Sequence, residues 1–504
     1  MSSSANISKN QQAVIVGVGE ITEKLESGQI GREPMRLIVG ACENAMADTG
    51  ANSEALKAVI NAVYVINQMG WPYADLASLT AENLGISGAL CEESPVGGNM
   101  PTLYLTEAAR QVQSGEQAMV IVAGGEATAS LVAAGKLQQR PDWTPPQAGK
   151  PRPSKADFFH PEALKYGLNM PIDVYPLYDN AIRAEWGQSF AEAQRESGDI
   201  GAGMAAVAAA NPNSWLGKPF SSEEISTPSE KNRLVVHPYT KWMIANPVVN
   251  QASACIVTTY EKAIALGVAE DKLVYIGSGV GGAEPRDILS RSGYTEAHAM
   301  SSVLKKALEI NDMSAVPELV ELYSCFPCVP KLARRALGLS ETAVLSVTGG
   351  LTFFGAAVNN YMGHAIAAMV HAIRAGKGEN GLLYGNGEFV TKHHAVVLYR
   401  QPVSKPVENL NLQDDLDANY GEVPEVLSVY NGTSILETYS LWYSRDGQPE
   451  RAALICRTPE NKRHLAAVNA PATLQALISG EKEVIGASGV ASAGDDGLNY
   501  WLAV

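Results

Sequence analysis

The chain repeats itself at a spacing of about 260 residues, and this repeat constrains the fold more than any other feature of the sequence. A glycine-rich apolar run stands at Ala13 (AVIVGVGE) and again at Leu273 (LVYIGSGVGG), so that Gly277 follows Gly17 by 260 residues. Spacings of 260 or 261 residues join three further pairs: Val63 and Tyr323, Asn99 and Asn360, and Gly124 and Gly385. Four landmarks at one spacing predict two copies of one unit; the alternative is the loose self-similarity of any α/β chain.

Within each copy, short apolar runs alternate with amphipathic stretches, which is the pattern of β-α units around a largely parallel sheet. In the first copy we expect strands at Ala13–Gly19, Val59–Ile66 and Ala118–Ala123, and helices at Pro34–Thr49 and Met100–Gln113. The sequence therefore predicts an α/β protein made of two β-α-β-α-β-α-β-β halves.

Changes in this pattern divide the chain into three parts. Residues 1–270 form the first half, with a Pro-, Trp- and Tyr-rich loop region inserted at about 130–248, and residues 271–400 form the second half. Residues 401–504 contain strand-like segments such as ILETYSLWYS and RAALICRT separated by turn sequences. This third part predicts a small, OB-like β-rich domain.

Charge and composition exclude several classes of partner. The formal net charge of −15 argues against nucleic acid or an anionic membrane. The β-rich part has 7 Lys and Arg against 14 Asp and Glu from residue 402 onward, which is the wrong sign for a phosphate backbone. Six cysteines in 504 residues do not make a disulfide framework, and the polar start MSSSANISKN does not resemble a signal peptide. We expect a cytoplasmic protein, monomeric or homodimeric, with no nucleic-acid or membrane partner.

Three segments carry a resemblance to a known family: NMPTLYLTEAARQVQSGEQAMVIVAGGEA from Asn99, ELYSCFP from Glu321 and TGGLTFFG from Thr348. They resemble the helix and strand after the thiolase nucleophile, a catalytic segment of the second thiolase half, and the approach to the thiolase Gly-His-Pro motif. Over about residues 10–400 the chain thus resembles the thiolase superfamily. The C-terminal β-rich part narrows the resemblance to bacterial thiolase-like proteins of type 1. It implies a duplicated, five-layered α/β/α/β/α fold.

The resemblance also shows what this chain lacks. The nucleophilic cysteine's position falls on Gly98 and the Gly-His-Pro histidine's on Ala356. The asparagine or histidine of the oxyanion site is replaced by Tyr323, and the second cysteine's position falls within Gly385-Asn386-Gly387. Covalent acyl transfer needs an activated thiolate, so the usual thiolase reaction is not expected.

Tyr323 and Cys325 are the first candidates for catalysis, because both belong to the segment that the family uses. A tyrosine hydroxyl can donate a hydrogen bond to an enolate, and some thiolase relatives without the nucleophile are aldolases that use tyrosines. The alternative is a buried structural tyrosine. Cys325 is expected to be a single active-site thiol. Together with Cys328 it also forms a C-x-x-C motif. No second C-x-x-C accompanies this motif, so no metal site is expected.

Asn360 and His393 are the other catalytic candidates. Asn360 lies near the position of the family's lost histidine, where it can orient a thioester carbonyl. The alternative is that it caps a helix, as Asn99 and Asn359 are expected to do. In the pair His393-His394, one imidazole must face inward if the segment is a strand, and it can then approach the pocket. An inert position at the strand edge is the alternative.

A binding site for coenzyme A is expected in the inserted region, because its positive charge is unusual in an acidic protein. Arg140, Lys150, Arg152 and Lys155 cluster there, and Trp143 or Trp186 can cover the adenine. The alternative is a solvated loop with scattered charge. No tightly bound cofactor is expected, and coenzyme A or an acyl-CoA is the substrate.

These inferences together predict a thiolase-like, acyl-CoA-handling protein of lipid metabolism. It acts as an acyltransferase, or it forms or cleaves carbon–carbon bonds without the usual nucleophilic cysteine. The alternative is a non-catalytic relative that binds coenzyme A or another protein.

Overall fold

The computed structural model describes residues 7–147, 154–468 and 470–503. Its largest sheet joins both copies of the repeat, in the strand order β3-β2-β4-β7-β1-β8-β11-β10-β9. The strands of the first copy are β1 (Ala13–Thr22), β2 (Ala62–Val65), β3 (Leu90–Glu93), β4 (Met119–Ala127) and β7 (Asn250–Thr259). Those of the second copy are β8 (Val274–Ala283), β9 (Leu319–Leu322), β10 (Asn380–Gly387) and β11 (Lys392–Tyr399), and β12 (Asn409–Asn411) pairs with β8.

The two copies have the same strand arrangement. In the first copy β2 is parallel to β4, which is antiparallel to β7; in the second, β9 is parallel to β10, which is antiparallel to β11. The two first strands, β1 and β8, meet in the middle of the sheet, where Val14 pairs with Tyr275. The predicted duplication is therefore confirmed.

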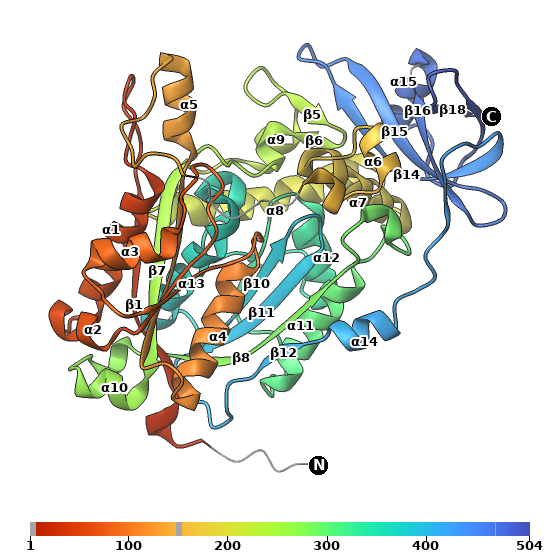
Figure 1. Ribbon diagram of the computed structural model, residues 1–504. Coiled ribbons are helices and arrows are strands. Elements are labelled where there is room, and N and C mark those ends of the chain that lie inside the picture. The colour runs from red at the N-terminus through yellow and green to blue at the C-terminus, as the bar shows by residue number, and fades with distance from the viewer. Residues whose placement is uncertain (1–6, 148–153, 469, 504) are drawn as a thin grey trace.

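The strands of the two copies make up the two β layers, and helices form three layers around them, as Figure 1 shows. The five layers α/β/α/β/α are therefore confirmed. The outer layer on the first copy contains α1 (Pro34–Thr49), α2 (Ser53–Val59), α3 (Leu76–Leu84) and α10 (Tyr260–Ala265). The central layer is α4 (Met100–Ser114) and α13 (Tyr361–Arg374), which contact each other and strands of both copies. The outer layer on the second copy is α11 (His298–Ile310) and α12 (Cys328–Ala336).

Glycines on β1 allow α1 to lie directly against this strand. A β-carbon on Gly17 would stand 2.2 Å from the carbonyl oxygen of Ala45, and one on Gly19 would stand 2.2 Å from that of Ala41. Any side chain at these positions would push the helix off the sheet. The glycines of the repeated motif therefore serve helix packing.

The inserted region is mostly helical, which differs from the expected loops. It contains α5 (Thr128–Leu137), α6 (Pro161–Lys165), α7 (Pro171–Glu185), α8 (Phe190–Ala210), α9 (Ser222–Ser226), β5 (Leu234–Val236) and β6 (Tyr239–Thr240). In α8, alanines and glycines replace larger apolar side chains and weaken the helical period, although Ser189 and Glu192 form a capping box at its start. None of the helices in the described ranges is long and apolar enough to cross a membrane.

The C-terminal part forms a small closed β-barrel. Its strands are β14 (Gly432–Tyr443), β15 (Pro449–Arg457), β16 (Arg463–Val468), β17 (Ser488–Ala493) and β18 (Asn499–Ala503). They pair in the cyclic order β14-β15-β16-β18-β17-β14, with β16 parallel to β18 and α15 (Pro471–Ser479) before β17. This five-stranded arrangement is OB-like. β5 of the inserted region pairs with β14, whereas α14 (Gln413–Ala418) and β13 (Val426–Leu427) precede the barrel.

Candidate active site

A cavity of about 490 Å³ lies where the two copies and the inserted region meet. Most of its wall is apolar, with side chains that include Met69, Phe158, Ile172, Ile244, Leu351 and Phe389. An apolar pocket of this size with a few polar groups is the usual form of a small-molecule site. It is therefore the first place to look for chemistry.

The four positions that the family resemblance marks all lie at this cavity. Gly98 precedes α4, Tyr323 follows β9, Ala356 precedes α13, and Asn386 is near the end of β10; each of them lines the cavity. Counting along the motifs thus led to four positions that line one cavity.

No side chain fits at Gly98. A β-carbon there would stand 2.5 Å from the Tyr323 hydroxyl oxygen and 2.5 Å from the backbone carbonyl oxygen of Asn386. The hydroxyl of Tyr323 thus occupies the space into which a nucleophilic side chain at position 98 would extend. This space adjoins the start of α4, where unpaired N–H groups favour negative charge.

The Tyr323 hydroxyl is protonated and can act as a hydrogen-bond donor. Burial raises the pKa of Tyr323 well above its ordinary value, so the phenol does not serve as a base near neutrality. Within the described ranges, no hydrogen bond holds this hydroxyl. A protonated, uncommitted donor is what a developing oxyanion requires.

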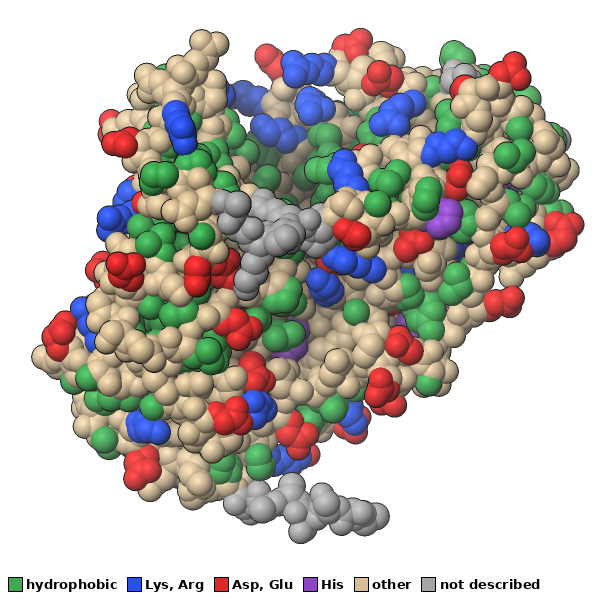
Figure 2. Space-filling view, viewed as in Figure 1, with side chains coloured by type: hydrophobic (Ala, Val, Ile, Leu, Met, Phe, Trp, Pro, Cys, Tyr) green, Lys and Arg blue, Asp and Glu red, His purple; other side chains and the backbone are tan. Residues whose placement is uncertain are grey.

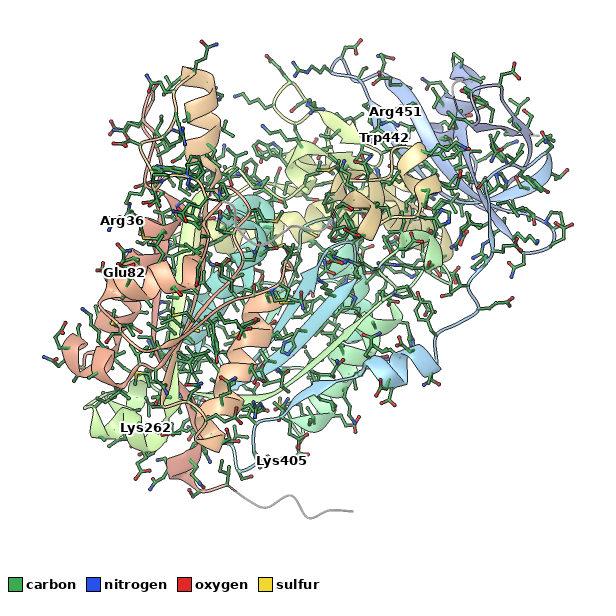
Figure 3. The ribbon with its side chains drawn as sticks, in the orientation of Figure 1. Arg36, Glu82, Lys262, Lys405, Trp442 and Arg451 are labelled. Atoms are coloured by element: carbon green, nitrogen blue, oxygen red, sulfur yellow. The ribbon has the colours of Figure 1, made fainter. Side chains whose placement is uncertain are left out.

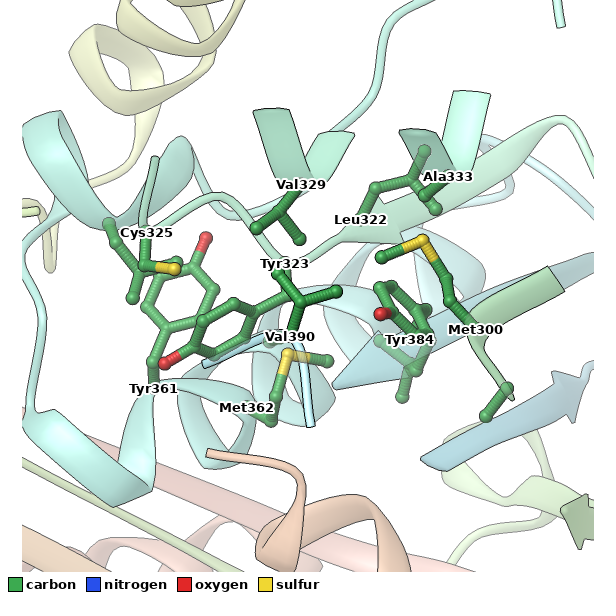
Figure 4. Close-up of a cluster of buried hydrophobic side chains, with 14 of the residues drawn as sticks. Met300, Leu322, Tyr323, Cys325, Val329, Ala333, Tyr361, Met362, Tyr384 and Val390 are labelled. Atoms are coloured by element: carbon green, nitrogen blue, oxygen red, sulfur yellow. The ribbon is translucent and has the colours of Figure 1, made fainter. Parts of the chain in front are cut away.

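A buried carboxylate fixes the surroundings of Tyr323. Glu321 accepts hydrogen bonds from the Tyr361 hydroxyl at 2.7 Å and from the Ser346 hydroxyl at 2.8 Å, and burial raises its pKa. The Tyr361 ring in turn packs edge-on against Tyr323, with ring centroids 5.8 Å apart. Figure 4 shows Tyr323, Tyr361 and Cys325 side by side in this cluster. Glu321 therefore holds the ring that orients Tyr323.

Cys325 lines the cavity, as its place next to Tyr323 suggested. Burial raises the pKa of its thiol to about 12, although Tyr175 and Asn386 contact the sulfur and oppose this rise. The thiol is therefore not an activated thiolate at neutral pH. Cys328 lies behind the cavity wall, where its sulfur donates to the backbone oxygen of Tyr175, and packing accounts for it.

The asparagines before α13 cross-link the two copies instead of capping helices. Asn360 does not line the cavity; its amide donates to the backbone oxygen of Gly124 at 2.7 Å and to the Ser253 hydroxyl at 2.9 Å. The neighbouring Asn359 does line the cavity and accepts a hydrogen bond from the Gly97 N–H. Val358, the residue before this pair, has a φ of +46°, which is unusual for a β-branched residue. The Asn99 side chain makes no cap either.

Neither histidine of the pair on β11 lines the cavity. The His393 ring bonds to the Tyr384 hydroxyl at 2.8 Å, and Tyr384 packs beside Met300 and Ala333 in the core (Figure 4). Burial lowers the pKa of His393 to about 3, so the ring is neutral. The strand turns His393 inward, as expected, but toward the sheet's packed face rather than toward the cavity.

The sequence did not point to two polar cavity residues, Tyr175 and Glu388, and it marked Asn386 only as part of the position of the second cysteine. The Asn386 amide donates to the Tyr175 hydroxyl at 3.0 Å, and Tyr175 donates to the backbone oxygen of Glu388 at 2.8 Å. The Glu388 carboxylate is paired with Arg286 at 3.0 Å and with Lys392 at 2.7 Å. The glycines on both sides of Asn386 were the sequence signal for its place in the site. No such signal marked Tyr175, because it lies in a helix that the sequence did not predict.

The predicted coenzyme A residues are only partly described. Arg140 and Lys155 are exposed, and Lys155 lies three residues before Phe158 of the cavity wall; Lys150 and Arg152 lie outside the described residues. On the face shown in Figure 2, Lys and Arg side chains gather around a hollow above the centre.

The two tryptophans proposed to cover the adenine are engaged elsewhere. The Trp143 indole donates to the Gly31 carbonyl at 3.0 Å, and Trp186 packs under the Arg335 guanidinium at 3.5 Å. Neither of them lines the cavity.

Comparisons with known proteins agree with this fold. The family described as "Thiolase-like protein type 1 additional C-terminal domain" matches residues 411–495. The chain is similar to a monomeric SCP2-thiolase-like protein type 1 from Mycobacterium smegmatis, with 27% identity over 99% of this chain and 100% of that chain, and a TM-score of 0.83. No curated protein sequence matches the chain.

Two more distant structures share the fold over 78% of this chain. One is the Ltp2–ChsH2(DUF35) aldolase, with 18% identity, 98% of that chain covered and a TM-score of 0.59. The other is human mitochondrial 3-ketoacyl-CoA thiolase, with 14% identity, 100% of that chain covered and a TM-score of 0.55. The chain therefore has the thiolase fold and is similar over nearly its whole length to a thiolase-like protein type 1, and its residues 411–495 match the additional C-terminal domain of such proteins.

Proposed function

We propose that this protein binds an acyl-CoA with its acyl group in the cavity and breaks or forms a carbon–carbon bond beside the thioester, without an acyl-enzyme. The observation that carries this proposal is the Tyr323 hydroxyl, which fills the nucleophile's space next to the start of α4. A donor in that place can stabilise a thioester enolate, but it cannot become acylated as a thiolate does.

In the cleavage direction, the substrate is a β-hydroxyacyl thioester. The hydroxyl gives up its proton to solvent water, which later returns a proton to the α-carbon. The hydroxyl's carbon becomes a carbonyl, and the electrons of the broken carbon–carbon bond form the enolate of the shortened thioester. Tyr323 donates a hydrogen bond to the enolate oxygen, and protonation of the α-carbon completes the reaction. One such preorganised donor typically contributes roughly 10²–10³ in rate.

Acyl transfer is the related thiolase chemistry, and the geometry favours it less. It needs a nucleophile, yet Gly98 offers none and the pKa of Cys325 is raised to about 12. Support for a CoA ester comes from Arg140 and Lys155, which are exposed in the inserted region, and from the names of similar proteins, which include a 3-ketoacyl-CoA thiolase and an aldolase. This substrate would place the protein in lipid metabolism.

A non-catalytic binder is the second candidate, and the state of Glu388 favours it. Glu388 supplies a carboxylate to the described part of the cavity wall, where Arg286 and Lys392 neutralise it. Both cations hold this carboxylate in ion pairs, and the neutral His393 does not line the cavity. The binder retains the ligand site without the proton transfer.

Turnover distinguishes the two candidates. The protein is incubated with β-hydroxyacyl-CoA esters, and mass spectrometry follows the shortened acyl-CoA and the carbonyl product, while a thiol reagent detects free coenzyme A. The proposal expects equal amounts of the two cleavage products and no free thiol. Tight binding in calorimetry with no product would establish the binder, and free thiol without a carbonyl product would indicate hydrolysis.

A further inference from the structure

Helix α7 connects the C-terminal barrel to the cavity. At its start, Met170, Pro171 and Ile172 form part of the cavity wall. Along its length it packs on β14, where the Thr438 hydroxyl donates to the Leu177 carbonyl and the Asn180 amide donates to the Tyr439 carbonyl. The helix that shapes the cavity is therefore mounted on the barrel.

The carboxylate of Asp173 joins the two ends of this connection. One oxygen accepts hydrogen bonds from the backbone N–H groups of Met170 at 2.9 Å and Asn169 at 3.3 Å, which closes the turn at the cavity. The other oxygen accepts from the indole N–H of Trp442 on β14 at 2.9 Å. Asp173 is only 7% exposed, so these charge-assisted bonds lie largely out of water.

Trp442 is itself held in place within the barrel. It pairs with Arg451 of β15 and with Val236 of β5, and the Arg451 guanidinium lies over its ring at 3.8 Å. Figure 3 shows the two side chains next to each other where the barrel meets the body of the molecule. The indole N–H therefore reaches Asp173 from a rigid base.

We propose that Trp442 is a positioning residue through which the barrel holds the α7 side of the cavity wall closed. Without its hydrogen bond, the turn at Met170 and Pro171 keeps its sequence but loses its fixed position. The cavity then opens more often, and its interior becomes more accessible. The C-terminal domain thereby controls entry to the site although none of its residues lines the described part of the cavity wall.

The thiol of Cys325 reports on this opening, because it lines the cavity and is only 8% exposed. Its rate of alkylation by N-ethylmaleimide is measured by mass spectrometry, with the half-buried Cys91 on β3 as an internal reference. In Trp442→Phe, which keeps an aromatic ring under Arg451, the ratio of the two rates should rise about tenfold, as expected for loss of a hydrogen bond to a charged group. An unchanged ratio would overturn the proposal.

Two further variants keep the test specific. Tyr443→Phe removes the neighbouring contact between barrel and body, a hydrogen bond to the His237 ring at 3.1 Å, and should leave the ratio unchanged. Asp173→Asn should raise it as Trp442→Phe does, and the double variant should add little, since both remove one interaction. An equal rise in Tyr443→Phe, or fully additive effects, would contradict the assignment. No substrate is needed, so the result does not depend on the proposed reaction.

Discussion

The hydroxyl oxygen of Tyr323 lies 2.5 Å from the point where a β-carbon on Gly98 would stand. The two residues are therefore coupled: with tyrosine at 323, position 98 accepts only glycine. The phenol of Tyr323 thus fills the space into which a side chain at position 98 would extend.

Gly98→Ala should destabilise the protein by about 1–3 kcal/mol, the usual cost of overpacking a buried site. Replacing Tyr323 with alanine as well should recover only part of this loss, because the Asn386 carbonyl also lies 2.5 Å from the added carbon. Denaturant unfolding measures both. Gly203→Ala in α8, where an added carbon meets nothing within 4 Å, is the matched control and should cost nothing. Equal stability of Gly98→Ala and the wild type would contradict the described packing.

Incubation with acetyl-CoA should leave the mass of the intact protein unchanged. Gly98 has no nucleophile, and the Cys325 thiol is protonated because burial raises its pKa to about 12. Mass spectrometry of the intact chain and of its peptides checks this. An acetyl group on Cys325 would instead make that thiol the catalyst and favour acyl transfer.

Stability should fall as the pH drops below 6.5. Burial lowers the pKa of His237 and His393 to about 3 and that of His394 to about 4, so these rings are neutral in the folded state. Between pH 6.5 and 4 the unfolded chain binds protons that the folded chain does not. Each histidine should then lower the free energy of unfolding by about 1.4 kcal/mol per pH unit. Denaturant unfolding at pH 7.5 and 5.5 measures the loss.

The variant His394→Gln serves as a control for this pH dependence. The amide can keep a hydrogen bond toward Asn409, the present partner of the ring, but it does not titrate in this range. The slope of the unfolding free energy against pH should decrease by the contribution of one histidine. The unfolding free energy at pH 7.5 should change less than the value at pH 5.5. An unchanged slope would contradict the prediction, because it would show that His394 does not contribute to the pH dependence of stability.

Charge reversal at Lys155 should weaken the binding of coenzyme A. Lys155 is exposed and lies close in sequence to Phe158 of the cavity wall. In calorimetry, Lys155→Glu should bind less tightly than the wild type, and the difference should shrink in high salt as screening removes the Coulomb attraction. Lys262→Glu is the control, because Figure 3 places Lys262 at the far lower end of the molecule. Equal losses in both variants would indicate a general charge effect.

The repeat made most of the fold predictable from sequence. The predicted helices Pro34–Thr49 and Met100–Gln113 agree with the structure to within one residue, because an amphipathic helix that ends at a glycine has a strong local signal. The α8 helix lacked such a signal, since small residues hide its period. The addition of β5 to the barrel depends on contacts between distant segments, which no local pattern encodes.

Positions in the cavity wall were predictable where they lie at a fixed spacing from a motif. They were not predictable where the direction of the side chain determines whether it lines the cavity. Gly98 and Tyr323 were found because they keep fixed spacings from recognisable segments. Asn359 lines the cavity and its neighbour Asn360 does not, and sequence spacing alone does not distinguish two adjacent asparagines. His393 faces the packed side of its sheet, because the register of β11 against its neighbouring strands sets which side each residue faces.

The most direct test of the account compares turnover and stability in Tyr323→Phe. This change removes a hydroxyl that no hydrogen bond holds within the described residues, so the melting temperature should stay close to that of the wild type. Cleavage of a β-hydroxyacyl-CoA should slow by roughly 10²–10³, because the enolate loses its donor. Full turnover in Tyr323→Phe would contradict the central claim that this hydroxyl, in the space that Gly98 leaves open, performs the chemistry.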